Sequence, residues 1–112
     1  MIHGKLGDIA HARSGDKGSH ANIGVIALNK EAYLFLLETL TAEKVESFLQ
    51  GLHPQSTVRF ELPNLYAFNF VLYGILDGGA AHSLRTDSQG KTLGQALLQL
   101  PLSYHERILN GK

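Results

Sequence analysis

Apolar residues recur at strand spacing in two segments near the start of the chain. Residues 6–12 alternate imperfectly between two faces, and residues 21–28 contain the β-branched run Ile23, Val25 and Ile26 between polar neighbours. Such short β-branched runs are typical of buried strands. We therefore expect two strands here, joined by the polar segment between them.

Helical spacing follows in the next two segments. Residues 31–37 are rich in Leu and aromatic residues. In residues 41–51, Thr41 suits the N-cap position and Glu43 suits the positive end of a helix. An apolar face at i, i+3, i+4 and i+7 is formed there by Val45, Phe48, Leu49 and Leu52. We expect a helix in each segment, the second ended by a glycine and a proline.

Strict alternation returns in residues 57–62, which predicts a half-buried strand ended by Pro63. The alternation predicts that one set faces the core and the other faces solvent, namely Val58, Phe60 and Leu62 against Arg59 and Glu61.

Residues 65–76 fit two structures. A strand of that length would be about twice the usual size, whereas Asn64 could cap a helix and Gly78-Gly79 could end it. A helix would place on one face Leu65, Phe68, Asn69, Leu72, Tyr73 and Leu76. We interpret the segment as a helix, and its aromatic content leaves a strand as the alternative.

The C-terminal third completes the order of elements. We expect a short strand at 82–86, a turn at 87–90, a helix at 91–99 and a loosely held tail at 102–112. This order favours an α+β fold, a ferredoxin-like antiparallel sheet with helices 41–51 and 65–76 packed on one face. The expected core comprises Ile23, Val25, Phe48, Leu49, Val58, Phe60, Phe68 and Leu72.

Composition narrows the function classes. With 112 residues we expect one domain over 1–112, and the chain has no cysteine for disulfides, thiol catalysis or thiolate metal sites. Basic and acidic residues number ten each, so we expect no nucleic acid and no membrane as partner. The first residues hold no long apolar run, and a cytoplasmic location is expected. Neutral charge and unblunted sheet edges favour a homo-oligomer, most simply a two-fold dimer.

The polar segment between the first two strands is the candidate site. Two cations, a carboxylate, a hydroxyl and two glycines follow one another as Arg13, Ser14, Gly15, Asp16, Lys17 and Gly18. Such a loop can offer charged groups and several N–H groups to an anion or a partner protein. The plain alternative is a surface loop in which Asp16 pairs with a neighbouring cation.

Other polar residues give weaker indications of a site. Asn22 could hold the loop by bonding its backbone, and Arg85 is a further cation for an anionic ligand. Asp8, His11 and His20 have no recognised metal spacing, so we expect no metal and no cofactor. No catalytic constellation can be assigned.

The segment from Ala12 to Gly18, continuing through residues 21–27, is similar to a known family, as are Glu61-Leu62-Pro63-Asn64 and the block at 83–87. The chain resembles, over residues 7–98, the AtuA-related family, the ferredoxin-fold domain of acyclic terpene utilisation proteins. Ser19 and His20 depart from the expected pattern, so the resemblance gives His20 no role. It implies a link to bacterial breakdown of acyclic terpenes and branched acyl-CoA compounds, without a defined activity.

Two functions remain open. The chain could be an accessory subunit that docks on a large AtuA-type protein, which small size, neutral charge and the lack of a catalytic constellation favour. Alternatively, it could be a small enzyme or binding protein for an acyl-CoA or another anion, held by Arg13, Lys17 and Arg85.

Overall fold

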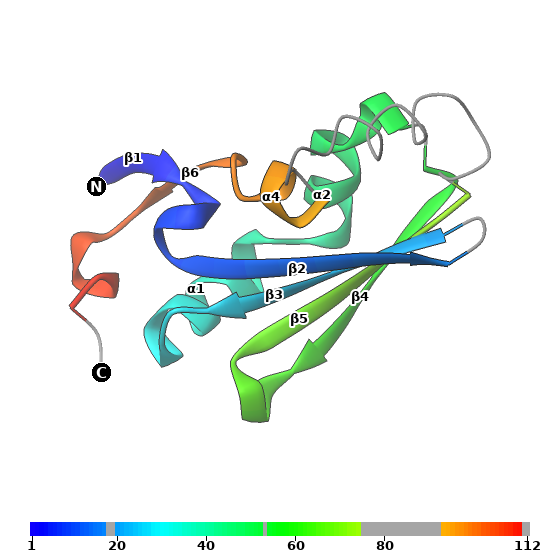
Figure 1. Cartoon of the computed structure of the whole chain (residues 1–112). Helices are drawn as coiled ribbons and strands as arrows, with labels where there is room; N and C mark the ends of the chain where they lie inside the picture. The colour runs from blue at the N-terminus through cyan, green and yellow to red at the C-terminus, as the bar shows by residue number, and fades with distance from the viewer. Residues whose placement is uncertain (18–19, 53, 75–92, 111–112) are drawn as a thin grey trace.

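The protein is a two-layer α+β structure with an antiparallel sheet on one side and helices on the other (Figure 1). The computed structural model describes residues 1–17, 20–52, 54–74 and 93–110. The four-stranded sheet has the order β2-β3-β5-β4, and β1 pairs with β6 in a separate two-stranded sheet. The strands are β1 (Ile2–Lys5), β2 (Ala10–Lys17), β3 (His20–Ala27), β4 (Ser56–Leu62), β5 (Ala67–Tyr73) and β6 (Pro101–Tyr104). The helices are α1 (Lys30–Thr39), α2 (Ala42–Phe48) and α4 (Leu93–Leu97). The expected α+β class is confirmed.

The first hairpin is longer than the sequence pattern predicts. A 3-10 turn at Leu6–Asp8 interrupts the expected strand, and β2 begins at Ala10. The β2–β3 ladder then runs without a break from Ala10 opposite Ala27 to Lys17 opposite His20. Residues 13–17 are therefore strand, and the expectation of a loop over them is wrong.

Strand β5 replaces the helix expected at 65–76. It lies between β3 and β4 and pairs antiparallel with both. Asn64, expected as a helix cap, sits in a 3-10 turn at Pro63–Leu65, and Tyr66 takes a left-handed conformation with φ of 52° before the strand starts. The strand alternative is correct, because the segment packs as a central strand.

The core lies between the helices and the inner face of the sheet. Of the expected core residues, five are buried, namely Ile23, Val25, Leu49, Phe68 and Leu72. Three are not: Phe48 is 38%, Val58 38% and Phe60 48% exposed. Phe48 is the last residue of α2, and it is the C-cap residue Leu49 that enters the core at this end of the helix.

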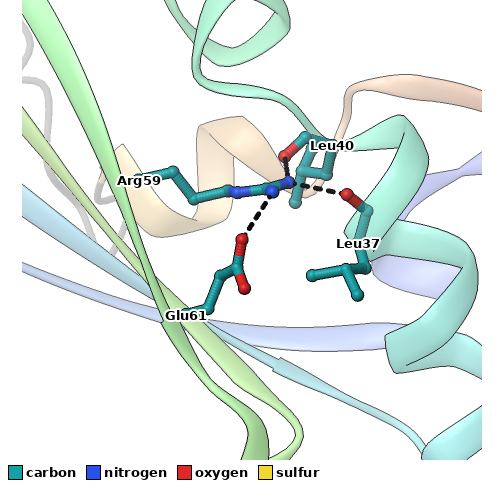
Figure 2. Close-up of polar contacts among 4 residues, drawn as sticks. All are labelled: Leu37, Leu40, Arg59 and Glu61. Carbon is teal, nitrogen blue, oxygen red and sulfur yellow. Dashed lines mark hydrogen bonds and ion pairs between the residues drawn. The ribbon is translucent and has the colours of Figure 1, made fainter.

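Strand β4 faces the opposite way from the prediction. Figure 2 shows the guanidinium of Arg59 pointing at the C-terminal end of α1, where one of its nitrogens donates to the carbonyl oxygens of Leu37 at 2.9 Å and Leu40 at 3.0 Å. The same group pairs with Glu61 at 2.9 Å and lies 5.2 Å from the ring centre of Phe68. Since Arg59 satisfies the end of the helix, the apolar residues of β4 face outward.

The helix starts follow the expected local chemistry. The Thr41 hydroxyl accepts from the Lys44 N–H at 3.1 Å, as predicted, and Asn29 caps α1 by accepting from the Ala32 N–H at 2.8 Å. Of the helix expected at 91–99, residues 93–97 are helical as α4, and residues 91–92 lie outside the described residues. The strand and turn expected at 82–86 and 87–90 lie outside the described residues.

The C-terminal tail is packed rather than loosely held. Strand β6 pairs with β1 along its whole length, and a 3-10 turn follows at Glu106–Ile108. The side chains of Leu102, Tyr104 and Ile108 are buried in the main core. The tail therefore closes one end of the molecule.

Candidate functional site

The predicted site residues on β2 fall on both sides of the sheet. Ser14 faces the helices, where its Oγ accepts from the Gly94 N–H at 3.0 Å. Arg13 and Gly15 stand on the opposite, solvent-facing side, because neighbouring residues of a strand point to opposite faces. Asp16 and Lys17 belong to the strand by backbone pairing, whereas Gly18 and Arg85 lie outside the described residues. Residues 13–17 thus do not form one loop site.

The solvent-facing side of the strands β2, β3, β5 and β4 is here called the open face. The register places its residues in rows that cross the sheet. The central row consists of Arg13, Gly24, Asn69 and Phe60. Polar and basic residues occupy the β2 end of the rows, and apolar residues occupy the β4 end.

Asn22 lies on this open face, opposite Gly15 on β2 and Val71 on β5. Its side-chain amide donates to Oδ1 of Asn69 at 3.4 Å, across β3 and β5. A neighbouring aromatic contact joins His20 and Tyr73, whose ring centres are 5.7 Å apart. Side-chain contacts between adjacent strands thus order the middle of the open face.

Two glycines on the open face have no evident structural requirement. Neither Gly15 nor Gly24 has a positive φ. A Cβ added to Gly24 would meet the Arg13 carbonyl oxygen at 3.9 Å, which is ordinary contact, and one added to Gly15 would meet only the Asn22 side chain at 3.3 Å. Glycine inside a strand weakens it and often marks a place where another molecule approaches the backbone closely. At these two positions no side chain covers the backbone of the open face.

The β4 end of the open face is apolar. Val58, Phe60 and Leu62 stand in line along the strand and are 38–48% exposed. Ile26 on β3, 43% exposed, extends the apolar surface toward β2. Exposed apolar residues grouped in this way mark interaction sites more often than scattered ones do.

The charge of the open face has one sign. Arg13 is an exposed cation on the same face as His11 and His20, and no Asp or Glu holds an open-face position in the described strands. Such a face favours an anionic or acidic partner surface. The whole chain is neutral, so this charge is a local feature.

Asp8 and Tyr104, which lie away from the open face, contribute to the fold. The Asp8 carboxylate accepts from the Tyr104 hydroxyl and from the Lys5 N–H, both at 3.0 Å. Burial raises the pKa of Tyr104, and the hydrogen bond and negative charge of Asp8 add to the rise. No group of three or more metal-ligating side chains occurs in the described part of the chain. Within that part, no helix is long and apolar enough to cross a membrane.

This arrangement defines a two-layer α+β domain whose candidate site is a sheet face instead of a cleft. The chain belongs to the AtuA ferredoxin-like domain family, whose model matches residues 4–103. The comparisons with curated proteins and with solved structures found no match. The resemblance stated from the sequence is confirmed by the family match.

Sequence reasoning missed Gly24, Asn69 and Phe60 as site residues. Gly24 was visible as a glycine inside a β-branched run, which is an unusual place for it. Asn69 and Phe60 carried no such signal. Asn69 could be placed in the row of Arg13 only after residues 67–73 were known to be a strand, and Phe60 only after the orientation of β4 was known.

Proposed function

We propose that this domain is an accessory subunit that docks through its open face on a large AtuA-type protein. It would serve bacterial breakdown of acyclic terpenes or branched acyl-CoA compounds, the chemistry with which the family is associated. The charge balance and the absence of cysteine fit a cytoplasmic location.

Gly24 is the observation that carries the proposal. A central strand position with room for a side chain but without one costs stability, about 0.5–1 kcal/mol relative to alanine. That cost is explained if a partner surface approaches the backbone here. Arg13 would then supply a charged group on one side of the contact, and Phe60 would supply an apolar group on the other side.

The partner surface is expected to be apolar where it meets the β4 end of the open face and to place a carboxylate near Arg13. Among the described residues, no carboxylate of this chain lies opposite the basic side chains of the open face. A charge-assisted hydrogen bond from Arg13 to such a carboxylate would contribute about 1.5–3 kcal/mol.

Gly24→Val tests the proposal because stability and binding should move in opposite directions. Valine favours strands, so the free energy of unfolding should stay the same or rise by up to about 1 kcal/mol. Binding to a co-expressed AtuA-type protein that lacks its own ferredoxin-like domain should fall at least tenfold. Urea unfolding and calorimetric titration measure the two quantities.

Ala12→Val is the matched control, because Ala12 lies on the helix side of β2, close to α4. Ala12→Val should lower the free energy of unfolding, in contrast to Gly24→Val. Arg13→Glu should also weaken binding without unfolding the chain. Undiminished complex formation by Gly24→Val would overturn the proposal.

A small anionic ligand is the second candidate, favoured by the exposed Arg13. Titration of the isolated chain with an acyl-CoA separates the two functions. Saturable binding that Arg13→Ala and Gly24→Val both abolish, with no complex with the AtuA-type protein, would establish the ligand-binding function and exclude docking.

A further inference from the structure

Strand β4 forms one edge of the four-stranded sheet. Among the described residues its backbone pairs with β5 alone, so its outer N–H and C=O groups face away from the ladder. Edge strands are often blunted by proline, by bulges or by inward-pointing charged residues. Ser56–Leu62 has no proline, and its inward cation Arg59 is already bound by Leu37, Leu40 and Glu61.

We propose that β4 pairs antiparallel with β4 of a second copy of this chain, joining two four-stranded sheets into one about a two-fold axis at Phe60. This inference goes beyond the proposed function, because the contact uses the edge of the sheet. It shares Phe60 with the docking surface and leaves Arg13 and Gly24 on the open face free.

The register follows from the order of residues along β4. With Phe60 opposite Phe60 of the second copy, Arg59 stands opposite Glu61 of that copy, and Glu61 opposite its Arg59. An antiparallel strand thus meets itself with opposite charges facing each other twice and no like charges directly opposite, which favours association. Glu61 has a side chain 49% exposed, so half of its surface is free for this contact.

The other side of the strand is complementary as well. The same register sets Val58 opposite Leu62 of the second copy, and the two Phe60 rings opposite each other. These three side chains are the exposed apolar residues of β4. One two-fold contact therefore covers apolar surface on the open face and pairs charges on the helix side, while Pro63 ends the shared ladder.

The natural lack of cysteine makes a single introduced cysteine a direct probe of this register. Directly opposite antiparallel residues have Cα atoms about 4.5–5.5 Å apart, which a disulfide can span. Phe60→Cys should cross-link to a covalent dimer in a glutathione redox buffer. Val58→Cys alone should not, since residues 58 of the two copies lie about 13 Å apart along the strands. A mixture of Val58→Cys and Leu62→Cys chains should cross-link to each other.

Ile26→Cys is the matched control, on the same open face but on β3. Cross-linking through Ile26→Cys in place of Phe60→Cys would show face-to-face association and overturn the edge contact. Equal cross-linking of Val58→Cys and Phe60→Cys would overturn the register.

Light scattering on the unmodified chain at tens of micromolar should give twice the chain mass. Phe60→Lys, which sets two ammonium groups opposite each other at the axis, should give the monomer mass, whereas Ile26→Lys should stay dimeric. A monomeric unmodified chain would overturn the proposal. Gly24→Val, which lies away from the β4 edge, should keep the dimer mass, so a dimeric Gly24→Val chain with undiminished binding of the AtuA-type protein would overturn the docking function and leave the edge contact standing.

Discussion

Arg59 shows how one side chain can settle the orientation of a strand. Its guanidinium serves two carbonyl oxygens at the end of α1, the Glu61 carboxylate and the face of Phe68, with only 18% of the side chain exposed. The last carbonyls of a helix have no partner within the helix, so a donor placed there removes a desolvation cost. Lysine, a point charge with a different geometry, would not serve the same set.

Replacing Arg59 should therefore cost more than breaking an ion pair does. Arg59→Met should lower the free energy of unfolding by about 2–3 kcal/mol, because hydrogen bonds to charged groups are lost and two helix carbonyls stay unsatisfied. Arg107→Met is the control, since Arg107 pairs with Glu31 at 3.9 Å with a side chain 72% exposed. That change should cost no more than about 1 kcal/mol. Equal losses in urea unfolding would mean that the Arg59 hydrogen bonds are energetically unimportant.

At the scale of elements, the approach of α4 to β2 depends on a residue without a side chain. A Cβ at Gly94 would lie 3.2 Å from the carbonyl carbon of Arg13 and 3.3 Å from that of Ala12. Backbone atoms cannot move aside as a flexible side chain can. Gly94 also donates its N–H to Ser14, so the helix and the strand are joined at the same point.

Gly94→Ala should consequently destabilise the protein, although alanine normally favours helices. We expect a loss of about 1–3 kcal/mol from overpacking against the strand. Gly51→Ala is the matched control, because a Cβ at Gly51 meets no atom within 4 Å. It should leave the midpoint of thermal unfolding unchanged or raise it. A stabilised Gly94→Ala protein would contradict close packing of α4 on β2.

At the scale of the whole molecule, the two ends of the described chain hold each other. The β1–β6 ladder joins them, and the Asp8 carboxylate links the turn after β1 to Tyr104 on β6. A side chain at Gly4 would collide with that carboxylate. The β1–β6 ladder and the Asp8–Tyr104 hydrogen bond therefore leave no room for a side chain at position 4. Tyr104 is only 2% exposed, which makes this link part of the core.

This link predicts a loss of stability in alkali. Burial and Asp8 raise the pKa of Tyr104 above its value of about 10 in the unfolded chain, so the folded protein keeps the hydroxyl proton to higher pH. The unfolded state then binds fewer protons, and stability that is complete below about pH 10 falls as the pH rises further.

Tyr104→Phe tests the link. It should be less stable than the unmodified protein by about 0.5–1.5 kcal/mol at pH 8, because one hydrogen bond is lost. The difference should narrow above about pH 10, since phenylalanine cannot ionise. Tyr73→Phe, at an exposed site, is the control and should keep the alkaline loss of the unmodified protein. A difference that stays constant from pH 8 to 10.5 would argue against the raised pKa.

The sequence by itself determined the features that depend on local chemistry. Thr41 predicted its helix start because a hydroxyl there can meet an N–H three residues on. The β-branched run with Ile23 and Val25 predicted a buried strand. The mixture of strand and helix patterns was enough for the α+β class, and the string from Ala12 to Gly18 pointed to the family that the family match shows.

Tertiary structure decided what depends on neighbours. Residues 67–73 satisfy both helical and strand spacing, and only the free pairing edges of β3 and β4 made them a strand. Alternation in β4 predicted a strand but not its facing, which the carbonyls at the end of α1 decided through Arg59. Likewise, polar residues 13–17 read as a loop until their pairing with β3 placed Arg13 on one face and Ser14 on the other. Local propensity acts along the chain, whereas hydrogen-bond pairing and burial act across it, so the candidate site appeared only once the strands were side by side.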